Sequence, residues 1–177
     1  QTIPPAGYEV GQAIFAFQIA QGQDLPLVGN DAYAGPFFFY LLAGLFRMGL
    51  TDPLAGRAVI LIAGTLTAPL TYAWVRQLGG NRAAGLIAAS LVATNPHLIL
   101  LNSHVGGTTF LLPFLTSLFL WLLSCALAID HPGWWMASAV VAGLATQSNP
   151  VGGLPVASGW LWATYRMRSS PRLGRGW

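Results

Sequence analysis

Long apolar runs without a single charged residue dominate the pattern of this sequence. A bilayer core about 30 Å thick requires about 20 mostly apolar residues in each spanning helix. Residues 58–75, 83–129 and 131–165 carry no formal charge. The first run predicts one membrane span, and each of the other two is long enough for two. The spans that we expect are 58–76, 83–102, 108–129, 134–149 and 152–166.

Turn-forming residues divide the two longer runs. NSHVGG (102–107) and SNPVGG (148–153) concentrate small and polar residues, which are typical of turns. Pro69 and Pro113 are expected to kink their spans. Small residues recur four positions apart in two spans, and such pairs let helix backbones approach closely. They are Ala84, Gly85, Ala88 and Ala89 in one span, and Ala139 and Gly143 in another.

The first fifty residues follow a different pattern. A short helix is expected over about 7–21, ended by Gly22, with a loop after it. The uncharged part of 36–50 is too short to span before Arg47, which predicts a juxtamembrane helix lying at the membrane surface. We therefore expect three parts: an extracytoplasmic loop with juxtamembrane helices (1–50), a transmembrane helix bundle (51–168) and a basic cytoplasmic tail (169–177).

Composition agrees with a membrane protein and excludes other classes of protein. Hydrophobic residues make up 54% of the chain and charged residues 7%, against about 25% charged in an ordinary soluble domain. A soluble enzyme and a disordered chain are both excluded on this basis. The net charge of +3 is too small and too dispersed for nucleic-acid binding. The lone Cys125 allows neither an internal disulfide nor a cysteine metal cage, and a core position is expected for it.

The arginines predict an orientation. Six of the eight lie in two regions, the turn of Arg76 and Arg82 and the tail after residue 165, and such clusters face the cytoplasm. The expected spans then alternate consistently, and the acidic first segment and the NSHVGG turn both lie outside. This predicts a multi-pass protein of the cell (inner) membrane. Four tryptophans, Trp134, Trp135, Trp160 and Trp162, fit an interfacial belt.

The sequence contains none of the short motifs that mark common soluble enzymes. Candidate catalytic and binding residues are therefore the polar residues expected at the outer face. Glu9 is one of five acids; a carboxylate there could deprotonate an acceptor hydroxyl or hold a divalent cation, or it could be a solvated loop acid. Arg57 opens the first full span, where it could bind a phosphate through two hydrogen bonds or extend to the lipid headgroups.

Two further candidates flank the outer turns. His104 could bind a phosphate or a sugar hydroxyl, or be an ordinary loop histidine. Asn149, with Gln147 and Ser148, could face a cavity or satisfy backbone groups freed at a helix end. The three histidines lack metal-ligand spacing, so no metal site is predicted from them.

The order of segments resembles the membrane module of GT-C glycosyltransferases, in particular the protein O-mannosyltransferase and aminoarabinose-transferase families. The matching stretches cover roughly residues 8–165: YEVGQAIFAFQIAQG, YAGPFFFYLLAGLFRMGL, GRAVILIAGTLTAPLTYAWVRQLGG, NRAAGLIAASLVATNPHLILLNSHVGG and GLATQSNPVG. The resemblance implies transfer of a sugar from a polyprenyl-phosphate donor to an acceptor at the outer face, with an outer-loop acid as base. It also implies a further span before the acidic pair and a longer whole protein, of which this would be the N-terminal half.

The family pattern is incomplete in this chain. The acidic pair reads Tyr8-Glu9, the second outer turn SHVGGTTF carries no acid, and Gly35 stands where a basic residue is often found. Glu9, or another acid such as Asp31, would then have to serve as the base. The alternative is a catalytically inactive, transferase-like accessory subunit of a larger membrane complex. A transporter is disfavoured, because the span interiors hold almost no ionisable residues.

Overall fold

The computed structural model describes residues 7–23, 25, 35–50, 52, 55–104 and 108–169, and every element within these ranges is helical. Helices α1 (Gly7–Ala20) and α2 (Phe37–Arg47) precede six others. These are α3 (Ala55–Gln77), α4 (Arg82–Ala93), α5 (Pro96–His104), α6 (Leu112–Ile129), α7 (Pro132–Ser148) and α8 (Gly153–Ser169). Short 3₁₀ turns, η1 (Thr108–Leu111) and η2 (Pro150–Gly152), lead into α6 and α8. The predicted all-α fold is confirmed over these ranges.

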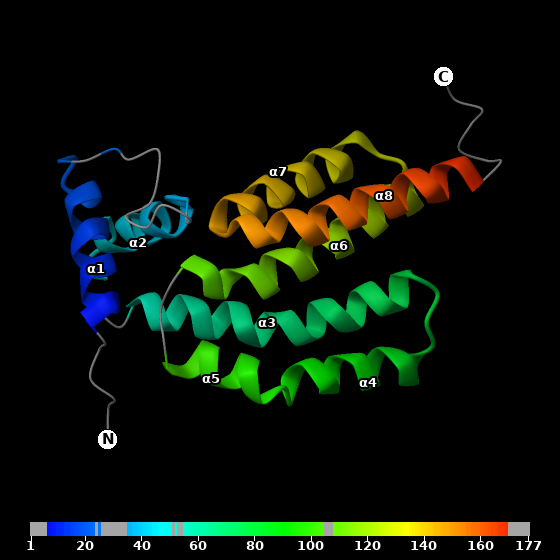
Figure 1. Cartoon of the computed structure of the whole chain (residues 1–177), viewed down its shortest axis with the longest axis horizontal. Coiled ribbons are helices and arrows are strands. Elements are labelled where there is room, and N and C mark those ends of the chain that lie inside the picture. The colour runs from blue at the N-terminus through cyan, green and yellow to red at the C-terminus, as the bar shows by residue number, and fades with distance from the viewer. Residues whose placement is uncertain are drawn as a thin grey trace.

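Helices α3 to α8 lie side by side with their long axes aligned (Figure 1). Helix α3 lies between the α4–α5 pair and α6, and α6 in turn packs against α7 and α8. Helices α1 and α2 contact each other and sit together across one end of this bundle. The structure therefore has an aligned bundle with a two-helix cap at one end.

The packing of α3 shows how little of its apolar surface the described bundle covers. Its buried residues are Gly56, Ile60, Ala63 and Thr67, a narrow stripe at the spacing of one helix face. On its other faces Leu61 and Ile62 are more than half exposed. Of the described helices, α3 and α6 are long and apolar enough to cross a membrane. Only 17% of the most apolar stretch of α3 is buried, and 39% of that of α6. A lipid environment accounts for such exposed apolar faces better than water does. The expected number of five spans stays a prediction.

The helices differ from the expected spans in two details. The residues of the expected span 83–102 form two helices, because Pro96 cannot donate a backbone hydrogen bond and Asn95 caps a new helix. Pro113 produces no kink inside a span, because α6 begins at Leu112 and a proline in the first helical turn removes no intrahelical bond. Pro69 does lie inside α3, which continues as one helix to Gln77.

Small residues mediate close packing, but not all at the expected positions. A Cβ on Gly85 would lie 2.8 Å from the ring of Tyr72, so α4 approaches α3 as closely as predicted. The prediction for Ala139 and Gly143 is wrong: both are exposed, and a Cβ on Gly143 would meet nothing within 4 Å. The close approach on this side is made by Gly159 of α8, where a Cβ would lie 2.7 Å from Phe119.

The predicted first helix is confirmed, and its C-terminal end is held from α2. Helix α1 is followed by Gly22 at a φ of +74°, a conformation that glycine adopts without strain. Arg47, in the last turn of α2, donates from Nε to the carbonyl of Ala20 at 2.9 Å and from a terminal nitrogen to that of Ile19 at 3.5 Å. The bond to Ala20 pairs a carbonyl at the helix end, while the carbonyl of Ile19 also accepts from the N–H of Gly22 at 3.0 Å. The guanidinium places a positive charge at the negative end of the α1 dipole.

Candidate active end of the bundle

The two ends of the bundle differ in what they bring together. The end of the bundle at which α1 and α2 lie is called the α1–α2 end. The start of α3, the end of α5, the start of α6, the end of α7 and the start of α8 lie there too. We call the opposite end the basic end; among the described residues it carries Arg76, Arg82, Arg166 and Arg168. Three of the candidate residues described by the structure, Arg57, His104 and Asn149, lie at the α1–α2 end.

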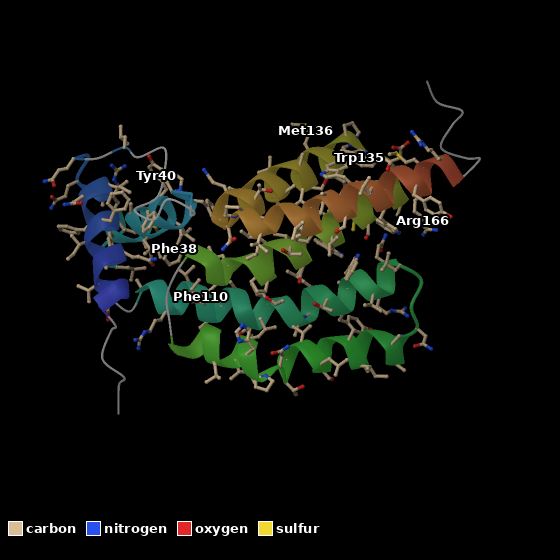
Figure 2. The ribbon with its side chains drawn as sticks, viewed as in Figure 1. Phe38, Tyr40, Phe110, Trp135, Met136 and Arg166 are labelled. Carbon is tan, nitrogen blue, oxygen red and sulfur yellow. The ribbon has the colours of Figure 1, made fainter. Side chains whose placement is uncertain are left out.

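Packing between α2 and α3 sets the position of Arg57. A Cβ on Gly56 would lie 3.6 Å from Phe38 and 3.8 Å from Leu42, so α2 packs directly over the first turn of α3. Phe38 and Leu42 belong to the core cluster that also contains Ile60 and Leu115. Figure 2 shows Phe38 and Phe110 at this end of the bundle. The first turn of α3 is thereby fixed on a rigid core.

Arg57 is the third residue of α3 and is half-buried. The first turn of a helix presents backbone N–H groups that have no intrahelical acceptor, and the helix dipole favours an anion there. In α3 the first of these, the N–H of Ala55, donates to the carbonyl of Asp52 at 2.9 Å. A guanidinium in the same turn adds planar donors that match phosphate geometry. This combination suits an oxyanion, and it is the strongest feature for ligand binding that the described residues offer at this end.

The end of α7 is closed by the segment that leads into α2. The N–H of Gly35 donates to the carbonyl of Gln147 at 2.6 Å, and a Cβ at position 35 would collide with the Gln147 side chain. The departure from the family pattern at Gly35 thus has a steric reason: a basic side chain would not fit here without a shift of α7.

The polar residues after α7 satisfy backbone groups. Asn149 Oδ1 accepts from the N–H of Val151 at 2.9 Å and caps η2. The hydroxyl of Ser148, which is buried, donates to the carbonyl of Leu144 at 2.8 Å. The capping bond uses one of the two lone pairs of Asn149 Oδ1, so a ligand could be contacted by the amide N–H groups or by the second lone pair.

The other candidates are placed only in part. Glu9 is the third residue of α1 and His104 is the last residue of α5, but the side chains of both lie outside the described atoms. Asp31 lies outside the described residues altogether. Figure 1 shows the first turn of α1 at the same end as the start of α3 and the end of α5. Within the described ranges, no three His, Cys, Asp or Glu residues group in a way that could hold a metal ion.

Sequence reasoning did not identify Gln12 as a residue of interest. Its side chain is 6% exposed, and its Oε1 finds no hydrogen-bond donor. It lies on the same face of α1 as the buried Ala16 and Ile19. This spacing could have identified the residue from the sequence, because it places a glutamine on the apolar face of the helix.

Tryptophan side chains cluster toward the basic end. Trp135 and Trp160 stack with ring centres 6.0 Å apart, and Arg166 lies over Trp162 at 5.8 Å. Figure 2 shows Trp135 and Arg166 in the half of the bundle away from α1. Tryptophan beside arginine is the composition expected where a bundle meets lipid headgroups.

Comparison with known families decides the class of the protein. Residues 33–170 match the model of the dolichyl-phosphate-mannose-protein mannosyltransferase family. The chain belongs to this family. The resemblance to GT-C glycosyltransferases is therefore confirmed, and the match runs from the segment before α2 to the end of α8, leaving α1 and Glu9 ahead of it. Neither the curated proteins nor the solved structures contain a significant match.

Proposed function

We propose that this membrane glycosyltransferase-family chain moves a sugar from a polyprenyl-phosphate donor to an acceptor at the α1–α2 end of the bundle. The observation that carries the proposal is the position of Arg57 in the first turn of α3, on the core formed with α2, inside the region that matches the family. There it would hold the donor phosphate together with the N–H groups of the α3 N-terminus.

The reaction that we propose is a displacement at the anomeric carbon. The acceptor hydroxyl oxygen forms a bond to that carbon while the bond from the carbon to the phosphate oxygen breaks. The polyprenyl phosphate leaves with the electron pair, and its charge is stabilised by Arg57. The hydroxyl proton passes to a carboxylate, for which Glu9 in the first turn of α1 is the candidate and Asp31 the alternative. His104 and Asn149 would contact the sugar or phosphate from the ends of α5 and α7. A divalent cation bound by Glu9 or Asp31 would be an additional aid to departure of the phosphate.

The orientation belongs to the same proposal. The α1–α2 end would face the outside of the inner membrane, and the turn of Arg76 and Arg82 and the C-terminal tail would face the cytoplasm. The support is the concentration of described arginines at the basic end, next to the tryptophan cluster. A donor whose sugar lies on the outer leaflet would then meet Arg57 directly.

The test is release of polyprenyl phosphate by the chain in lipid nanodiscs. Replacing Arg57 by Gln should reduce kcat/KM about 10- to 100-fold, the effect of losing a charge-assisted hydrogen bond, and Arg57→Lys should restore part of the activity. Glu9→Gln should reduce kcat about 100-fold or more if Glu9 is the base. Arg168→Gln, a change of an exposed arginine at the basic end, is the matched control and should leave turnover unchanged.

The accessory-subunit alternative is favoured by one observation, the single acid in the pair Tyr8-Glu9. This alternative predicts the opposite result in the polyprenyl-phosphate release assay. No donor would be turned over by the chain alone, while the chain would copurify with another membrane protein at fixed stoichiometry. Unchanged turnover in both Arg57→Gln and Glu9→Gln would remove these residues from the mechanism.

A further inference from the structure

Gln12 of α1 is a buried polar residue whose oxygen the chain leaves unpaired. Its side chain is 6% exposed, and its Oε1 accepts no hydrogen bond within the part of the chain that the structure describes. Helix α2 packs against α1, and the side chains that α2 buries carry no hydrogen-bond donor: Phe38, Phe39, Leu42, Ala43 and Phe46. A buried acceptor without a donor destabilises the folded chain, whereas a methionine of similar length would fill the same space without that cost. Packing alone therefore gives no reason for an amide at this position.

The register of α1 places this amide beside the first turn of the helix. Helical side chains lean toward the N-terminus, so each one covers the turn before its own Cα. For Gln12 that turn holds residues 8 and 9, and Glu9 is the candidate base. Positions three apart on a helix are neighbours on its surface. A substrate that brings its reacting atoms to Glu9 therefore also comes within reach of Gln12.

The contacts that hold α1 lie in its second half, after Gln12. The rings of Phe15 and Phe39 meet edge to face with centres 5.0 Å apart, and Arg47 binds the end of the helix. On the other side of Gln12, a Cβ on Gly11 would meet nothing within 4 Å, and a glycine inside a helix weakens it. The first turns of α1 are thus held least, and their movement away from α2 would open Gln12 to a ligand.

The unpaired atom is an acceptor, and this defines the chemistry of its partner. The carbonyl oxygen of an amide accepts from a hydroxyl and cannot bind a phosphate oxygen, whereas Arg57 carries only donors and suits the phosphate. In the proposed reaction the acceptor hydroxyl gives its proton to Glu9, so it has none left for Gln12. The sugar of the donor carries other hydroxyls beside the anomeric carbon at which that reaction takes place.

We propose that Gln12 binds the sugar of the donor, its Oε1 accepting a hydrogen bond from a sugar hydroxyl when the first turns of α1 move to admit the ligand. Arg57 then holds the phosphate and Gln12 a hydroxyl of the same molecule. The inference rests on the proposed function and adds to it a residue that selects a hydroxylated sugar. Binding of the donor tests Gln12 without depending on turnover.

The first test is binding of polyprenyl-phosphate mannose, a donor of the kind in the family's name, to the whole chain in lipid nanodiscs without an acceptor. Gln12→Met should raise the dissociation constant about 3- to 10-fold, the effect of losing one neutral hydrogen bond. Gln18→Met is the matched control, because Gln18 is half-buried on another face of α1, and it should leave binding unchanged.

Donor analogues that each lack one sugar hydroxyl identify the group that Gln12 contacts. One of them should bind the natural sequence more weakly than the full donor does, by the factor that Gln12→Met causes. The same analogue should bind Gln12→Met no more weakly than the full donor, because the hydrogen bond is already gone. Independent losses from the variant and from every analogue would contradict a direct contact.

Melting temperature separates a ligand contact from a structural role. Gln12→Met removes the unpaired oxygen, so without donor it should melt at the same temperature as the natural sequence or higher. A lower melting temperature would show that folding requires the amide and would overturn the inference. So would unchanged donor binding in Gln12→Met while Arg57→Gln weakens it. If the natural sequence binds no donor, the proposed glycosyl transfer is refuted as well.

Discussion

The two helical glycines Gly143 and Gly159 give a sharp test of the packing. Both lie in long helices, α7 and α8, but their surroundings differ. A Cβ on Gly143 meets nothing within 4 Å, whereas a Cβ on Gly159 would lie 2.7 and 3.0 Å from the ring edge of Phe119 and 3.3 Å from Leu120. Apolar carbon atoms prefer separations of about 3.5–4.0 Å. The added methyl group at position 159 would therefore overlap the ring by roughly 0.8 Å.

The two substitutions to alanine should consequently change the free energy of unfolding in opposite directions. Alanine in place of glycine inside a helix stabilises it by about 0.5–1 kcal/mol, and Gly143→Ala should show this gain undiminished. In Gly159→Ala the same gain is offset by about 1–3 kcal/mol of overpacking, because Phe119 is fully buried and has little room to move. The two variants should thus differ by about 1–3 kcal/mol.

Reversible unfolding in mixed micelles, followed by circular dichroism, measures this difference. A second substitution tests the cause: Phe119→Leu removes the ring edge, so it should destabilise the Gly159→Ala background by less than it destabilises the natural sequence. A coupling free energy of about 0.5–3 kcal/mol is expected for residues in direct contact. Equal effects of Gly143→Ala and Gly159→Ala, or additivity with Phe119→Leu, would refute the packing of α8 against α6.

Three further predictions address two helix ends and the orientation in the membrane. Arg47→Met should weaken the α1 C-terminus by about 1 kcal/mol through loss of the bonds to Ala20 and Ile19, seen as faster amide hydrogen exchange in the last turn of α1, while Arg168→Met should not. Asn95→Ala should lower the free energy of unfolding by about 0.5–2 kcal/mol and Asn95→Asp, which keeps the acceptor, by much less. In intact cells, a cysteine in place of Val151 should react with an impermeant maleimide added outside, and one in place of Asn81 only after the membrane is opened; the reverse pattern would invert the proposed orientation.

The charge gaps predicted most of the helices because a charge is costly inside a membrane whatever it packs against. Helices α3, α7 and α8 begin and end within a few residues of the expected spans. Gly22 ends the first helix region for a local reason, its positive φ. These features depend on composition and backbone conformation alone, which a single sequence carries.

Contacts between helices were harder to predict. In a membrane the faces toward lipid and toward protein are both apolar, so periodicity does not distinguish Gly143 from Gly159. The role of Arg47 depends on where α1 ends in space, 27 residues away in the chain. At the candidate site the sequence identified Arg57 and Asn149, but it did not predict the backbone bond from Gly35 to Gln147 or the burial of Gln12.

The gathering of Arg57, His104 and Asn149 at one end follows from the direction of the chain and does not depend on which end faces outward. Helix α3 runs away from the α1–α2 end, and α4 and α5 return to it, since the break at Asn95 interrupts hydrogen bonds without reversing the chain (Figure 1). Helix α6 then leaves, α7 returns and α8 leaves. Had the Asn95-Pro96 step formed a tight turn instead of a cap, α5 would have carried His104 to the other end. The break thus keeps α5 running in the direction of α4, so His104 reaches the same end as Arg57, as it would on a continuous helix.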